Sequence, residues 1–103
     1  SGQVTYAVRD TSIDGKEIKT GDYMGIDDGG IKSVGTDITE VVKELISEMS
    51  DDSSELLSIY YGSDVSDEDA SAMEAALSEA YPELELEVQS GNQPVYYYLV
   101  SVE

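Results

Sequence analysis

The sequence predicts an α/β fold, a two-layer sandwich in which a mixed β-sheet carries two helices packed on one face. Three patterns support this fold class. Apolar residues alternate with a period of two early in the chain and again near its end, and two segments between them have apolar residues at helical spacing. A two-sided apolar run separates the predicted helices, as expected of a central strand. Because 103 residues suffice for one hydrophobic core, we expect a single domain over residues 1–103.

The first third of the chain is predicted to be mostly strand and turn. Val4, Tyr6 and Val8 alternate with other residues over 4–9, which predicts a strand with one buried face. Turn signals follow at 14–15 and 21–22. Two apolar stretches, 23–26 and 31–34, flank an Asp-Asp-Gly-Gly sequence, and this arrangement predicts a β-hairpin.

A helix is predicted to follow, with apolar positions at offsets 0, 3, 4, 7, 8 and 11 from Ile38. Asp37 is the expected N-cap, and Glu40 completes a capping-box-like pair. Residues 56–61 form the apolar run that predicts the central strand. A second helix is expected after Ser66, and Pro82 ends it.

The last third is predicted to contain two strands joined by a loop over residues 90–94. Alternation over 83–88 predicts that Leu84, Leu86 and Val88 face the core while glutamates face water. The final strand is expected over 95–102. In it Tyr97 would share a face with Val95 and Leu99, and Tyr96 and Tyr98 would point to the other face.

The charge of the chain excludes several classes of function. Twenty-three acids and five bases give a net charge of −18, which disfavours nucleic acid and anionic membrane surfaces as partners. All five bases lie in the first 43 residues, so no base balances the acids from Glu44 onward. The absence of cysteine and histidine removes thiol and imidazole catalysis and ordinary zinc sites. We therefore expect no catalytic, cofactor-binding or metal-binding residues, and a binding or assembly role.

Two motifs that suggest chemistry are better explained as helix starts. The strand, Gly62 and helix sequence could cradle a phosphate, but it lacks the known phosphate-loop patterns and is followed by acidic residues. Asp64, Asp67 and Asp69 could bind calcium, but the EF-hand pattern fails at its third, sixth and twelfth positions. Acids in the first turn of a helix are favoured by the helix dipole. No apolar run is long enough to cross a bilayer and no signal-peptide pattern is present, so we expect a soluble chain. The absence of cysteine fits a reducing compartment, and the expected location is the cytoplasm.

Several motifs together resemble a known family. They are GQVTYAVRD at the start, GDYMGI from Gly21, YYG from Tyr60, GNQPVYYY from Gly91 and the ending SVE. In this order they resemble the C-terminal domain of FakA, the catalytic subunit of bacterial fatty acid kinases in the dihydroxyacetone-kinase-like family. The order of elements also has a weaker similarity to the C-terminal domain of DegV fatty-acid-binding proteins.

The resemblance implies a role in a larger phosphotransferase. In that family ATP and magnesium bind a separate N-terminal domain, another domain mediates dimerisation, and a DegV-type protein, FakB, carries the acyl chain. This chain would then be a non-catalytic domain that docks the FakB-like protein so that its fatty acid carboxylate can be phosphorylated. The alternative is a DegV-like small-molecule or lipid binding domain. Residues 91–94 lack the histidine that DegV proteins carry in their corresponding segment.

The predicted docking surface is a loop beside the tyrosine run. Aromatic anchors rimmed by polar groups are typical of interfaces, and Asn92, Gln93 and Pro94 with Tyr96 match that pattern best. Gln93 and Pro94 could instead only shape the turn between the last two strands, and the tyrosines could only pack the core. A second candidate surface is the acidic start of the second helix, around Asp64 and Asp67.

Overall fold

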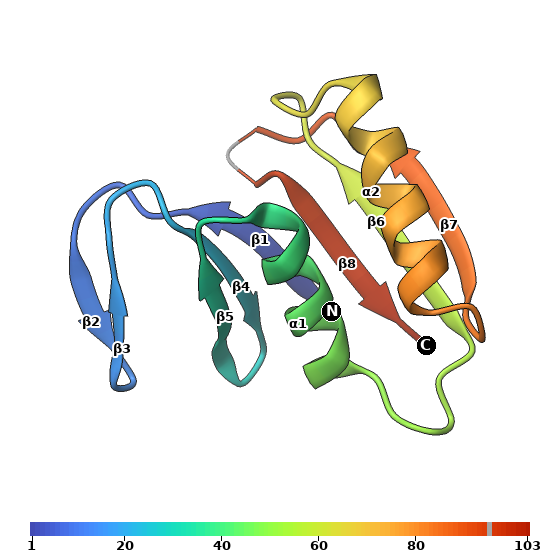
Figure 1. Ribbon diagram of the computed structural model, residues 1–103, viewed down its shortest axis with the longest axis horizontal. Helices are drawn as coiled ribbons and strands as arrows, with labels where there is room; N and C mark the ends of the chain where they lie inside the picture. The colour runs from blue at the N-terminus through green and yellow to red at the C-terminus, as the bar shows by residue number, and fades with distance from the viewer. Residues whose placement is uncertain (95) are drawn as a thin grey trace.

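The computed structural model describes residues 1–94 and 96–103 and confirms the two-layer α/β sandwich (Figure 1). Its strands are β1 (Gly2–Tyr6), β2 (Thr11–Ile13), β3 (Lys16–Ile18), β4 (Tyr23–Asp27), β5 (Gly30–Gly35), β6 (Leu56–Tyr61), β7 (Glu85–Ser90) and β8 (Tyr98–Val102). Its helices are α1 (Ile38–Met49) and α2 (Asp67–Ala80). Six strands form a mixed sheet in the order β5-β4-β1-β8-β6-β7, while β2 and β3 pair separately.

Both helices begin at the predicted caps. The Asp37 side chain accepts a hydrogen bond from the backbone N–H of Thr39 at 2.9 Å, and the Ser66 hydroxyl accepts one from Asp69 at 3.0 Å. Helix α1 packs over β4 and β5, where the buried Ser33 hydroxyl donates to the Val41 carbonyl at 2.8 Å. Helix α2 packs over β7 at the other side of the same face. The helices therefore lie side by side on one face of the sheet.

The hydrophobic core fills the space between this face and the two helices. Its buried members come from β1, α1, β6, α2 and β8, and include Val4, Leu45, Leu57, Leu77 and Val100. The predicted central strand β6 is an inner strand, since it pairs with β7 on one side and β8 on the other. Leu86 and Val88 face the core as predicted, but β7 is an edge strand and buries them only in part.

The first strand differs from the prediction at its end. Val4 is fully buried, but β1 ends at Tyr6, and Val8 is 76% exposed. Two backbone hydrogen bonds of 2.8 Å turn the chain here: the Ala7 N–H donates to Asp22, and the Gly21 N–H donates to Ala7. Ala7 is consequently buried in place of Val8.

Residues 11–18 form a two-stranded ribbon that the sequence prediction did not include. Only its turn was predicted: Asp14 and Gly15 both have positive φ, at 53° and 77°, as a two-residue hairpin requires. The strands have three residues each, too few for alternation to stand out. The ribbon nevertheless buries Ile18, which is 1% exposed.

The last strand begins later than predicted. Strand β8 starts at Tyr98, and Val95, the predicted first residue, lies outside the described residues. Tyr98 and Val100 are buried on the helix-covered face, so Tyr98 has the predicted alternation with Leu99. Tyr97 does not share the face of Leu99, because it precedes the strand and lines a cleft together with Tyr98.

Candidate functional site

The candidate residues lie at the end of the sheet where β6 stops and β8 begins. Strand β8 is antiparallel to β6 and β6 is parallel to β7, so the loop from β7 to β8 lies beside the loop from β6 to α2. The N-termini of α1 and α2 point to this same end (Figure 1). We call this region the tyrosine end, because Tyr6, Tyr23, Tyr61, Tyr97 and Tyr98 lie at or next to strand ends there.

The loop over residues 91–94 is held by its own glutamine. The Gln93 side-chain amide donates to the Tyr60 carbonyl at 3.0 Å and to the Tyr96 carbonyl at 3.4 Å. Its Oε1 atom is buried and has no hydrogen-bond partner among the described residues. Asn92, with φ of 55°, and Pro94 are exposed, and Tyr96 is half-buried. Gln93 thus holds the conformation of the loop, while the side chains of Asn92, Pro94 and Tyr96 are accessible for contact with another molecule.

The two candidate surfaces that the sequence suggested form one continuous region. The backbone N–H of Ser63 donates to the Gln93 carbonyl at 2.9 Å, and the N–H of Gly62 donates to Tyr97 at 2.8 Å. A Cβ atom at Gly62 would stand 2.8 Å from the Gln93 carbonyl oxygen and would collide with that of Tyr96. Glycine at this position therefore lets the two loops touch, and it places Asp64 beside the Gln93 loop.

The acidic residues at the start of α2 differ in their contacts. Asp67 accepts a hydrogen bond from the Tyr61 hydroxyl at 3.2 Å. Asp64 and Asp69 are exposed and contribute to the wall of a cleft between the two helix starts. This cleft has a volume of about 370 Å³, and its walls also include Tyr23, Ile38, Thr39, Val65, Ala72, Met73, Tyr97 and Tyr98.

A tyrosine cluster borders the cleft. The Tyr97 ring lies 5.7 Å from the ring centroids of both Tyr6 and Tyr23, tilted to the first and edge-on to the second. Burial raises the pKa of Tyr97, and the neighbouring Tyr23, Tyr6 and Asp64 add to the effect. Burial likewise raises the pKa of Tyr98 to about 12, with a contribution from Asp69. Both hydroxyls therefore keep their protons to a higher pH than an exposed tyrosine does.

Sequence reasoning missed this cluster because its members are far apart in the chain. Only the register of β1 with β4, which pairs Tyr6 with Tyr23, brings two of the rings together. The third ring is that of Tyr97, whose backbone N–H donates a hydrogen bond to the Val4 carbonyl at 2.8 Å. This bond holds Tyr97 beside β1. The one signal in the sequence was the unusual Tyr96-Tyr97-Tyr98 run.

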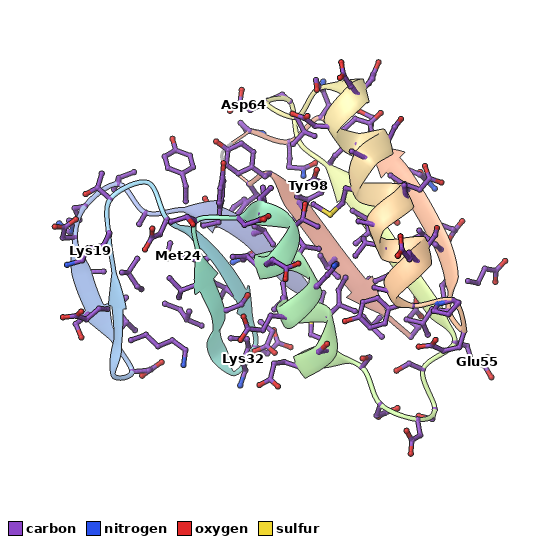
Figure 2. The ribbon with its side chains drawn as sticks, in the orientation of Figure 1. Lys19, Met24, Lys32, Glu55, Asp64 and Tyr98 are labelled. Atoms are coloured by element: carbon purple, nitrogen blue, oxygen red, sulfur yellow. The ribbon has the colours of Figure 1, made fainter. Side chains whose placement is uncertain are left out.

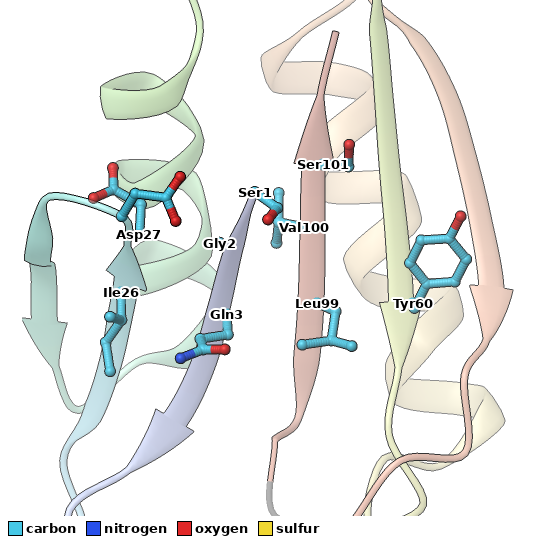
Figure 3. A pocket seen from close by; sticks show the side chains of 10 residues that line it. Ser1, Gly2, Gln3, Ile26, Asp27, Tyr60, Leu99, Val100 and Ser101 are labelled. Carbon is cyan, nitrogen blue, oxygen red and sulfur yellow. The ribbon is translucent and has the colours of Figure 1, made fainter.

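A second hollow lies on the face of the sheet that carries no helix (Figure 3). It has a volume of about 290 Å³, and one row of the sheet crosses it: Tyr60, Leu99, Gln3 and Ile26, each paired with the next across β6, β8, β1 and β4. Asp27 and Asp28 stand at its border. The row follows from strand register, which the sequence alone does not give.

No group of three carboxylates among the described residues is arranged to hold a metal ion. In the same residues, no helix has the length and apolar character needed to span a membrane. The ion pair of Lys43 with Glu40, at 3.3 Å, is exposed and lies within α1, so it adds little to the tyrosine end.

Comparison with known proteins places the chain in a family. The family model for the C-terminal domain of FakA-like fatty acid kinase subunits matches residues 1–103. The chain is 50% identical over 103 residues to Protein YloV of Bacillus subtilis (strain 168). It is 46% identical to an uncharacterized protein of Staphylococcus saprophyticus and 45% identical to one of Staphylococcus aureus (strain MRSA252), in both cases over the whole chain. It spans 19% of the length of each of these relatives. The chain belongs to the FakA-like C-terminal domain family of fatty acid kinases.

Proposed function

We propose that this chain is the non-catalytic C-terminal domain of an ATP-dependent fatty acid kinase, and that it docks an acyl-carrying DegV-type binding protein. The observation that carries the proposal is the family match over residues 1–103. Because the chain spans 19% of its relatives, the phosphotransfer chemistry would belong to another part of the protein. ATP and magnesium are accordingly expected on the N-terminal domain that precedes this one in the family.

The tyrosine end supports a docking role. Interfaces are enriched in tyrosine and carry polar groups around their apolar centre. Here Tyr96 and Tyr97 are half-buried, and Asn92 and Pro94 stand exposed beside them. The acids of α2 would steer a basic partner toward this end, since long-range attraction mainly raises the rate of association.

Docking would contribute to catalysis only by positioning the fatty acid relative to ATP. A fatty acid held in one protein and ATP held in another must meet in one geometry before the phosphoryl group can transfer. Fixing that geometry in advance removes several kcal/mol of entropic barrier, even when the docking domain supplies no reacting group.

Calorimetry with the purified chain tests the proposal. We expect saturable binding to a DegV-type protein loaded with fatty acid, and no heat of binding with magnesium-ATP. A third titration, with the fatty acid alone, addresses the DegV-like alternative. If the chain binds free fatty acid but does not bind the DegV-type protein, the docking function is wrong and the lipid-binding alternative is supported. Micromolar binding of ATP would contradict the placement of the nucleotide on another domain.

A further inference from the structure

The cleft between the starts of α1 and α2 has negative charge, the Tyr98 hydroxyl and aromatic walls. Together these three features indicate which chemical class of ligand it could bind. It has a volume of about 370 Å³, and it is open at the tyrosine end. Its floor is Tyr98, which is 2% exposed, and tyrosine rings and α2 side chains form its walls. Figure 2 shows Asp64 and Tyr98 at this same end of the molecule.

The charge in the cleft is negative and not balanced locally. Asp64 and Asp69 are on its wall, and no lysine or arginine is among the described residues that line it. Three of the backbone amides at the helix starts, which would otherwise attract an anion, are engaged by the capping side chains. Thr39 and Glu40 donate to the Asp37 side chain, and Asp69 donates to Ser66. The cleft therefore favours a cation.

The Tyr98 hydroxyl supplies a second, independent sign of a ligand. Tyr98 is almost completely buried, yet no hydrogen bond engages its hydroxyl within residues 1–94 and 96–103. Asp69 lines the same cleft as Tyr98, and its charge adds to the effect of burial in raising the pKa of this hydroxyl. Among the described residues only Gln93 Oε1 is both shielded from water and without a partner, so the Tyr98 hydroxyl reaches water at the cleft and could exchange that water for a ligand.

The aromatic walls of the cleft favour one kind of cation, a guanidinium, over an ammonium. Tyr23 and Tyr97 both line the cleft, with their rings edge-on to each other and their centroids 5.7 Å apart. A planar guanidinium can stack on the face of a tyrosine ring and can bond two carboxylates at once, whereas an ammonium is a compact and strongly hydrated charge.

We propose that the cleft lined by Tyr23, Tyr97, Tyr98, Asp64 and Asp69 receives an arginine side chain from the protein that docks at the tyrosine end. This inference rests on the proposed function and adds the recognition chemistry. The arginine would stack on tyrosine and bond the two aspartates. The Tyr98 hydroxyl oxygen would accept a hydrogen bond from the guanidinium, directly or through a bound water.

The first test uses a small probe in place of the partner. N-acetyl-argininamide is titrated into the chain while the ring signals of Tyr23, Tyr97 and Tyr98 are followed by NMR. N-acetyl-citrullinamide, which has the same shape without the charge, is the matched control. We expect saturable shifts at these rings with the arginine compound and at least about tenfold weaker binding of the citrulline compound. Equal shifts with both compounds, or shifts confined to other residues, would overturn the proposal.

The second test uses the DegV-type partner and separates this inference from the docking function. The double variant Asp64→Asn, Asp69→Asn is compared with Asp52→Asn plus Glu55→Gln, which removes the same charge from the segment between α1 and β6. Figure 2 shows Glu55 at the end of the molecule opposite Asp64. We expect the cleft variant to lose about tenfold or more in affinity and the control variant to change little. Circular dichroism checks that each variant is folded.

The outcomes of that experiment are distinct. If the wild-type chain binds the partner and the folded cleft variant binds equally well, the arginine site is wrong while docking stands. If the wild-type chain does not bind the partner, docking by this chain is wrong. Shifts with N-acetyl-argininamide would then still support the cleft as a guanidinium site.

Discussion

Replacing Tyr98 with phenylalanine should change how stability depends on pH. Burial of Tyr98 raises its pKa from 10.0 to about 12. In the unfolded chain the hydroxyl ionises near pH 10, whereas in the folded chain it keeps its proton up to about pH 12. The folded state therefore binds more protons in this window, and the free energy of unfolding falls as the pH rises through it.

The size of the effect follows from the two pKa values. Two units at about 1.36 kcal/mol each give about 2.7 kcal/mol that is fully present below about pH 10 and lost by about pH 12. About half of it, ~1.4 kcal/mol, should be lost at about pH 11. The Tyr98→Phe variant has no hydroxyl to ionise, so it should not lose this contribution.

Urea unfolding followed by circular dichroism between about pH 9 and pH 11 measures the effect. Other groups titrate in the same range in every variant, so the difference between the wild-type chain and Tyr98→Phe is the quantity of interest. Tyr60→Phe is the matched control, because Tyr60 is 37% exposed on the open face of the sheet. Parallel pH profiles for the wild-type chain and Tyr98→Phe would refute the reasoning.

Three further predictions concern the core, the charge and the docking loop. Leu45→Ala removes a fully buried side chain from the centre of α1 and should lower the free energy of unfolding by about 3 kcal/mol; a loss below about 1 kcal/mol in urea unfolding would mean that the site collapses around the smaller residue. Raising salt to about 0.2 M screens charges over roughly 8 Å and should raise the melting temperature, because the net charge is −18; a steady fall would contradict the dominance of repulsion. Replacing Gln93 and Tyr96 together by alanine should weaken partner binding by about 2 kcal/mol, measured by calorimetry on a variant shown to be folded; unchanged affinity would move the docking surface to the acidic start of α2 around Asp64 and Asp67.

The helices were predictable because their signals are local. The spacing of apolar residues from Ile38 gives the first and last residues of α1, and the Asp37 and Ser66 caps give both starts. Capping and amphipathicity depend on residues within about four positions of one another, so a single sequence contains them. Alternation over a short strand is weaker, and it failed at Val8 because a turn partner at Asp22 redirected the chain.

The candidate site was only partly predictable because its contacts join distant segments. The sequence singled out the Asn92–Pro94 loop and Asp64 as separate alternatives, and the bond between Ser63 and Gln93 joins them. The Tyr6, Tyr23 and Tyr97 cluster depends on strand order. Register and strand order depend on the whole chain. Distant strands gain hydrogen bonds and buried contacts only after the entropy cost of closing the long loops between them has been met.

The position of β8 has a consequence for how the polypeptide folds as it is synthesised. Strand β8 lies between β1 and β6, so the last strand of the chain joins the first strand to the middle one. Before residues 98–102 leave the ribosome, the hairpin side of the sheet and the β6-β7 side lack the strand that hydrogen-bonds to both. The edges of β1 and β6 that pair with β8 would be open during that interval, which makes the incomplete chain the form most exposed to aggregation and to chaperones. Closure then requires contacts between the two ends of the chain, and such long-range contacts make folding slow.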